Sequence, residues 1–327
     1  MGKLFFFGPL LALVLLFGNS ASLADPAEKY PNKQIRIIVP EVPKSSTDLV
    51  AEIVAARLTK TLGQQVTVDH ISNTAALEAG AKAEADGYTI IFAGQNTVTV
   101  APHLYKDLAY DPFRDFRPVS FVATMPFVLA VNPSVKANTV KDFIAAAKSK
   151  PDDFKMGAAG AGTGSHLAGL LFEKAASLKT PLVFYKGGGP TVAAIVDNQS
   201  QWFITPLPSA MAEIKAGKLK ALGVTGTARS PALPGVPVVA QAVPGYSQLF
   251  WGGLIVPKKT PSAIVRKLNT AIARSLSGAE VKDQFLALGA ESKTSTPDDF
   301  GKFLRAEYQR MGTAVQLAGI VPKDQKN

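Results

Sequence analysis

Apolar runs alternate with helical patterns along most of the chain. The run IRIIV at 35–39 predicts a buried strand, and 47–62 predicts a helix with one apolar face. Further apolar runs at 66–68 and 88–94 stand on either side of a helical stretch rich in small residues at 75–85. Because strands that alternate with helices usually pair in parallel, this part of the chain predicts βαβ units.

The alternation continues in a second series. The runs FVATM and FVLAV stand on either side of Pro126 and predict two separate strands. The elements that follow are predicted as helices at 139–149, 165–177, 190–197 and 207–216, and as strands at 155–158, 181–185, 201–204 and 219–225. A proline-rich passage at 229–246 then interrupts the pattern, before the run FWGGLIVP and three helical segments, the first at 261–277.

Two α/β lobes joined by crossing strands, with a ligand cleft between them, account for this order of elements. The chain leaves the first lobe near residue 125 and returns to it near residue 247. We therefore expect a two-lobed fold like that of periplasmic binding proteins. The first lobe comprises 25–125 plus 247–327, and the second lobe comprises 126–246. Two crossings of this kind make a hinge.

The first residues have the composition of a secretory signal peptide. Lys3 precedes an apolar run at 4–18, and small residues follow before Ala24. We expect a signal peptide at 1–24, cleaved after Ala24, and export to the periplasm. The alternative is an N-terminal anchor, but the run contains Gly8 and Pro9 and is shorter than the roughly 20 residues that span a bilayer.

Composition excludes several classes of site. The chain has no cysteine, so it has no disulfide framework, thiolate metal site or cysteine nucleophile. Its net charge is +10, but the basic residues are scattered singly, which argues against nucleic-acid binding and favours small anionic ligands. The three histidines, His70, His103 and His166, accompany neither a G-x-S-x-G nor an H-E-x-x-H motif. We expect neither an enzyme nor a cofactor or metal.

Four loops at the carboxyl ends of predicted strands could bind a ligand. The loop at 157–164 is rich in glycine and runs into a helix that Thr163 or Ser165 could cap, which makes an anion site or a tight packed turn. The others are YKGGGP at 185–190, AGQNTVT at 93–99 and EVPKSSTD at 41–48.

Stretches in all parts of the mature chain resemble the Bug-type periplasmic solute-binding proteins of tripartite tricarboxylate transporters. Among these are YPNKQIRIIVP, ADGYTIIFAG, LAYDPFRDFRPVS, GTGSHLAGLLF, YKGGGP and RSPALPGVPVVAQAVPG, and they occur in family order. The resemblance implies a monomer that closes on a small carboxylate by a hinge motion and delivers it to a two-subunit membrane permease. In some members the partner is a sensor kinase, so the alternative is a ligand-presenting or interaction protein with altered or lost binding.

The resemblance also implies ligand contacts in the second lobe. Matching positions in its two glycine-rich loops are Ala161, Thr163, Ser165, His166, Tyr185, Lys186, Gly187 and Gly189. Thr205 stands where the family often has an aspartate, which makes a ligand amine or hydroxyl at that point less expected.

The first lobe departs further from the family pattern. Glu41 replaces a phenylalanine, Lys44 and Ser45 replace paired glycines, and the second turn, DHISNTA with Asn73, has no glycine. We expect Lys44 to contact a ligand carboxylate directly, because charge-assisted hydrogen bonds are strong and a helix start favours an anion. The further contacts expected in this lobe are Ser45, Ser46, Thr47, Asn73, Gln95 and Asn96. The alternative is that Lys44 points to solvent and Glu41 only adds surface charge.

Overall fold

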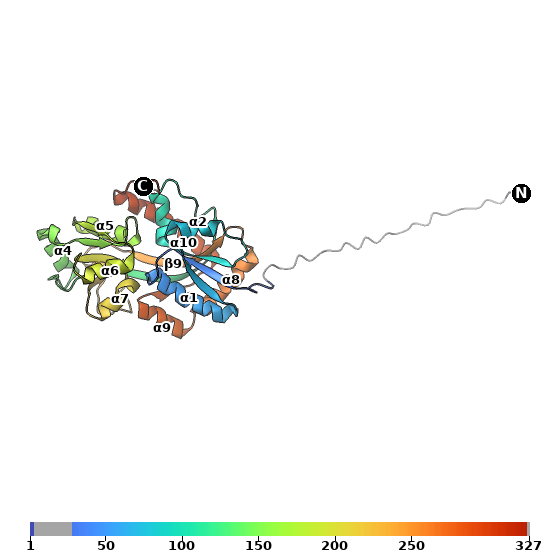
Figure 1. The fold of residues 1–327 in the computed structure, drawn as a ribbon, viewed down its shortest axis with the longest axis horizontal. Coiled ribbons are helices and arrows are strands. Elements are labelled where there is room, and N and C mark those ends of the chain that lie inside the picture. Colours follow the sequence, from blue (N-terminus) through green and yellow to red (C-terminus); the bar gives the residue numbers. More distant parts are fainter. Residues whose placement is uncertain (3–27, 326–327) are drawn as a thin grey trace.

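The computed structural model describes residues 1–2 and 28–325, and most of the expected signal peptide lies outside these residues. Figure 1 shows helices α4, α5, α6 and α7 at one end of the molecule and α1, α8 and α9 at the other, with strand β9 between the two groups. This arrangement confirms the predicted two-lobed α/β fold. The residue boundaries of the lobes stay a prediction.

One path of paired strands runs through both lobes. Its order is β2 (Val66–His70), β1 (Ile35–Val39), β3 (Thr89–Gly94), β9 (Leu249–Pro257), β4 (Phe116–Val131), β7 (Trp202–Pro206), β5 (Met156–Ala158) and β6 (Leu182–Phe184). β8 (Lys220–Val224) and β10 (Glu291–Ser292) pair with β4 off this path. Strands β1, β2 and β3 pair in parallel, as do β5, β6 and β7, whereas β4 and β9 pair antiparallel to their neighbours. Each lobe therefore has a parallel set, as the alternation predicts.

Strand β4 connects the lobes without a break, so the prediction of two strands around Pro126 was wrong. Residues 116–126 of β4 pair with β9, residues 127–131 pair with β7, and residues 128–131 pair with β8. Pro126 stands at the change of partners, where a missing N–H does least harm to the ladder. At the next residue, the N–H of Phe127 donates to the Thr225 hydroxyl at 2.9 Å.

Most predicted helices are present, with ends shifted by a few residues. Their bounds are α1 (Ser46–Leu62), α2 (Thr74–Ala81), α4 (Val140–Ser149), α5 (Gly164–Ala176), α6 (Gly188–Val196), α7 (Leu207–Lys215), α8 (Ser262–Leu276), α9 (Ala279–Leu288) and α10 (Pro297–Leu317). Short helical turns occur at η2 (Pro151–Asp153) and η3 (Val239–Gln241). The stretch predicted as a polar loop after β3 is instead a π-helical turn, η1 (Gln95–Val100), which continues into α3 (Ala101–Leu104).

The largest cluster of buried apolar side chains extends through both lobes. It includes Ile37 and Phe92 in the first lobe, Leu129 in β4 and Trp202 in the second, all of them fully buried. Because interiors of this kind are close-packed, the strands that carry the binding loops are held firmly on either side of the cleft. Among residues 1–2 and 28–325, no helix is both long and apolar enough to cross a membrane.

Candidate functional site

A small cavity lies where binding loops of the two lobes meet. Its volume is about 50 Å³. The first lobe contributes Glu41, Ser45, Ser46, Thr47 and Asn96; the second contributes Ala159, Thr163, Gly164, Ser165, Gly188, Thr205, Pro206 and Ser209; and Phe250 of β9 completes the lining. Apart from Phe250, these residues lie at or beyond the carboxyl ends of β1, β3, β5, β6 and β7, the edge at which open α/β sheets bind ligands.

Side chains hold the first-lobe wall where glycines were expected. The hydroxyl of Ser45, the N-cap of α1, accepts from the Asp48 N–H at 3.2 Å. The Asp48 carboxylate in turn accepts from the Lys44 N–H at 2.5 Å and lies 2.6 Å from His70 Nε2 at the end of β2. This network fixes the turn and places Ser46 and Thr47 against the cavity.

Lys44 takes a glycine-like backbone conformation in this turn. Its φ is 65°, in the left-handed region that favours glycine. The substitution has therefore kept the backbone shape that a glycine would adopt. The Lys44 side chain is exposed and does not line the cavity.

Glu41 lines the cavity, although the alternative drawn from the sequence placed it at the surface. Its Oε1 accepts from Asn96 Nδ2 at 2.9 Å. Burial raises the pKa of the Glu41 carboxyl above its usual range, and the hydrogen bond from Asn96 only partly opposes this. A carboxyl group of this chain thus occupies part of the space in which the sequence predicts a ligand.

A glycine-containing loop forms the second-lobe wall. Gly160 and Gly162 have φ values of 112° and 75°, which only glycine adopts readily. The Thr163 hydroxyl caps α5, accepting from the His166 N–H at 3.4 Å, so Thr163 and not Ser165 is the cap. Ser165 still lines the cavity, 3.1 Å from the Thr163 hydroxyl.

His166 braces this loop from behind. Its Nδ1 accepts from the Gly162 N–H at 2.9 Å, which requires a neutral ring with its proton on Nε2. Burial lowers the pKa of His166, so the same protonation state is favoured by its surroundings. His166 does not line the cavity. It holds the backbone of Gly162, which lines an adjoining hollow.

Direct hydrogen bonds join the lobes across the cleft. The hydroxyl oxygens of Ser46 and Ser209 lie 2.6 Å apart, and the Gly164 N–H donates to Asn96 Oδ1 at 2.7 Å. The first residues of α1, α5 and α6 all line the cavity, so the positive ends of three helix dipoles converge on it. The Thr205 hydroxyl is buried there without a hydrogen-bond partner among the described residues.

The structure brings about half of the predicted site residues together. Ser45, Ser46, Thr47, Asn96, Thr163, Ser165 and Thr205 line the cavity. Asn73 and Ala161 line an adjoining hollow of about 410 Å³, which shares Asn96, Ala159 and Thr163 with the cavity.

The remaining predicted residues lie outside both hollows. Tyr185 is 2.8 Å from the Ser200 hydroxyl, Lys186 is exposed, and Gly187 and Gly189 stand beside Gly188 without lining the cavity. Gln95 turns to α10, where its Nε2 lies 2.9 Å from the Met311 sulfur.

Sequence reasoning missed several cavity residues. Glu41 was noted only as a departure from the family pattern, while Ser209 was not considered, although it follows the end of β7 by three positions. The signal that could have found Ser209 is its place at the start of α7, directly after a strand that ends at the cleft. Gly164, Gly188, Ala159, Pro206 and Phe250 were also missed.

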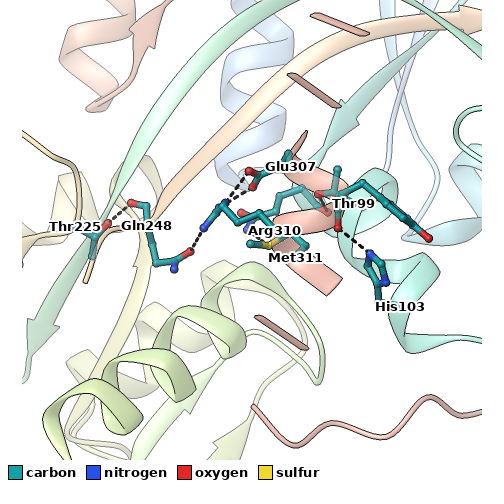
Figure 2. Close-up of polar contacts among 9 residues, drawn as sticks. Thr99, His103, Thr225, Gln248, Glu307, Arg310 and Met311 are labelled. Atoms are coloured by element: carbon teal, nitrogen blue, oxygen red, sulfur yellow. Dashed lines mark hydrogen bonds and ion pairs between the residues drawn. The ribbon is translucent and has the colours of Figure 1, made fainter. Parts of the chain in front are cut away.

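Helix α10 packs against η1 and against the segment that precedes β9. Figure 2 shows Gln248 between Thr225 and Arg310, with Glu307 against Arg310. The Thr225 hydroxyl donates to the Gln248 carbonyl at 2.6 Å, and Arg310 donates to Gln248 Oε1 at 3.3 Å. Because the same helix carries Met311 against Gln95, it contacts both the segment that crosses between the lobes and the turn that carries Asn96.

A family model and several known proteins match this chain. Residues 50–320 match the model described as the tripartite tricarboxylate transporter family receptor, TctC. The chain belongs to this family. Protein BugT of Bordetella pertussis (strain Tohama I) is 32% identical over 319 residues, which cover 95% of this chain and 97% of BugT.

Two solved structures of relatives are similar to this chain. The R. palustris protein Rpa4515 with adipate has a TM-score of 0.86 and 31% identity, over 90% of this chain and all of that one. The periplasmic binding protein BugD has a TM-score of 0.84 and 26% identity, over 90% of this chain and all of BugD. The family is one of solute receptors and not of enzymes. Within the described residues, no group of three or more His, Asp or Glu side chains could hold a metal ion.

Proposed function

We propose that this protein is a periplasmic receptor that captures a small carboxylate-type solute between its lobes and delivers it to a tripartite tricarboxylate-type permease. The observation that carries the proposal is the cavity at which the N-termini of α1, α5 and α6 converge. Helix N-termini present free N–H groups and a positive dipole end, and both favour an anion.

Backbone amides and hydroxyls would hold the solute carboxylate. No lysine, arginine or histidine is among the described residues that line the cavity. Hydroxyl groups of Ser46, Thr163 and Thr205 stand with the helix starts and can donate to carboxylate oxygens. The relative with adipate supports a carboxylate as ligand, since that protein is similar over nearly its whole length.

Closure of the hinge would complete the site. The two walls come from different lobes, and Ser46 and Ser209 lie within hydrogen-bond distance only when the lobes meet. A solute that contacts both walls therefore favours the closed arrangement over an open one. The compact form with its solute would be what the permease subunits recognise.

The chain would reach the periplasm through a signal peptide at 1–24 that is removed after Ala24, and would act there as a monomer. Solved relatives named as periplasmic support this location. Intact-mass measurement of the protein secreted to the periplasm would check the cleavage site.

Two matched variants test the site. Thr205 and Thr260 both have buried hydroxyls without a described partner, but only Thr205 lines the cavity. We expect Thr205→Val to weaken binding of the carboxylate that the protein retains by roughly 2- to 12-fold, because a neutral hydrogen bond contributes about 0.5–1.5 kcal/mol. Thr260→Val, measured by the same calorimetric titration, should leave the Kd unchanged. Equal effects of the two variants would place the ligand elsewhere.

A further inference from the structure

Among the described residues that line the cavity, Glu41 is the one with a charged side chain. The other residues of the described lining are serines, threonines, glycines, Asn96, Ala159, Pro206 and Phe250. The adjoining hollow, lined by residues such as Asn73, Thr97 and Gln325, also contains no charged side chain in its described lining. The formal charge that the side chains of these two described linings present to a ligand is therefore negative, beside the positive helix ends.

The Asn96 side chain fixes how Glu41 is presented. Asn96 Oδ1 accepts from the Gly164 N–H at 2.7 Å, so its Nδ2 must be the atom that faces Glu41 Oε1 at 2.9 Å. This chain of bonds begins in the turn after β1 and ends at the first residue of α5 in the other lobe. The Glu41 carboxyl is thus held in place where the lobes meet.

The Glu41 carboxylate has unused acceptor capacity. A carboxylate can accept about four hydrogen bonds, and among the described residues Glu41 receives the one from Asn96. Glu41 is half-buried, so a ligand that fills the cavity would shield its remaining acceptor sites from water. A ligand that donates to them is therefore favoured, whereas a second carboxylate placed beside Glu41 would be repelled.

Resting on the proposed function, we propose that Glu41 is a specificity-determining residue of this cleft. It selects monocarboxylates whose other end carries an ammonium or amide N–H group, and it rejects dicarboxylates. The carboxylate end of the ligand lies at the helix starts, and the N–H end donates to Glu41. This chain would then differ in ligand class from the relative whose structure holds adipate.

Ligands that share one carboxylate and differ only in the group at the other end test this selection. Calorimetric titrations near neutral pH would use succinate, succinamate and 4-aminobutanoate, and the longer series adipate, adipamate and 6-aminohexanoate. In the series that binds, we expect wild type to prefer the amide or ammonium member over the dicarboxylate by roughly 10- to 150-fold, the range of a charge-assisted hydrogen bond. Wild type that binds the dicarboxylate as tightly or more tightly overturns the inference.

Variants then assign the preference to Glu41. Glu41→Gln keeps the side-chain shape and offers an amide N–H, so it should lose the preference and bind the dicarboxylate more tightly than wild type does. Glu41→Asp keeps the charge and should keep the order of affinities. Glu52→Gln is the matched control, because Glu52 is exposed on α1 and the change removes the same charge. Thermal unfolding establishes that each variant is folded.

The results separate this inference from the proposed function. If a carboxylate binds and Glu41→Gln leaves the order of affinities unchanged, the role of Glu41 is wrong and the receptor function stands. If no member of either series binds wild type or any variant, the receptor function for small carboxylates fails, and the inference fails with it.

Discussion

The Ser46–Ser209 contact gives the sharpest test of the closed cleft. Ser46 is the first residue of α1 and Ser209 is the third residue of α7, so their hydrogen bond joins the two lobes directly. We would change each serine to alanine, singly and together. The double-mutant cycle then removes the effect that each serine has separately on the ligand and leaves the energy of their contact.

The structure sets the expected magnitude. The oxygen–oxygen distance is 2.6 Å, and both residues are in the cavity lining, at most partly accessible to water. A neutral hydrogen bond of this kind contributes about 0.5–1.5 kcal/mol. If the bond exists in the closed, liganded state and is absent when the lobes are apart, the coupling should change Kd by roughly 2- to 12-fold.

Calorimetric titration of the four proteins with the ligand that wild type retains would measure this coupling. Small-angle scattering of the same samples would report whether each protein still becomes more compact with ligand. A coupling energy within about 0.3 kcal/mol of zero, the usual error for independent sites, would refute a closed state in which these serines meet.

Three other predictions follow from the walls of the site. Gly162→Ala should lower the free energy of unfolding by about 1–3 kcal/mol more than Gly63→Ala, because both glycines have positive φ but only at Gly162 would a Cβ overlap with Leu104 Cδ1. Equal losses of unfolding free energy in chemical denaturation would show that the loop around Gly162 shifts to accept the methyl group. Burial raises the pKa of Glu41, so its contribution to stability is present below about pH 4, near its ordinary pKa, and is lost as the pH rises. Glu41→Gln should therefore raise the melting temperature at pH 7 and have a smaller effect at pH 4. A difference in melting temperature that does not change with pH would contradict this. Burial lowers the pKa of His166, so its contribution to stability is present above about pH 6.5 and is lost as acid protonates the ring nitrogen that accepts from the Gly162 N–H. His166→Gln should reduce the loss of melting temperature between pH 7 and pH 5. An unchanged loss would assign the acid sensitivity to other groups.

The fold was largely predictable because most of its strands and helices follow from the apolar pattern of their own residues. The buried run of β1 and the one-sided apolar pattern of α1 are periodicities that specify a strand and a helix without help from distant residues. The break predicted at Pro126 was wrong because β4 accepts a proline at the point where it changes its pairing partner, and that change is visible only in the complete sheet. The π-helical turn η1 was missed for a similar reason, since α10 packs on it from the far end of the chain.

The site was predictable where backbone chemistry forms it. Thr163 was one of the two residues predicted to cap the helix beside glycines, and the structure makes it the cap and places it in the cavity lining. Lys44 and Glu41 were harder, because their surroundings depend partly on His70 and Asn96, which lie outside the turn. Asp48 and His70 hold the turn so that Lys44 is exposed, and Asn96 draws Glu41 inward. None of Asp48, His70 and Asn96 is a sequence neighbour of Lys44 or Glu41.

Native mass spectrometry of protein purified from the periplasm, followed by release and identification of the bound molecule, tests the central claim most directly. The account predicts one small carboxylate per chain, held until the protein is unfolded. A retained molecule without a carboxylate group, or a ratio other than one per chain, would contradict a single carboxylate site between the lobes.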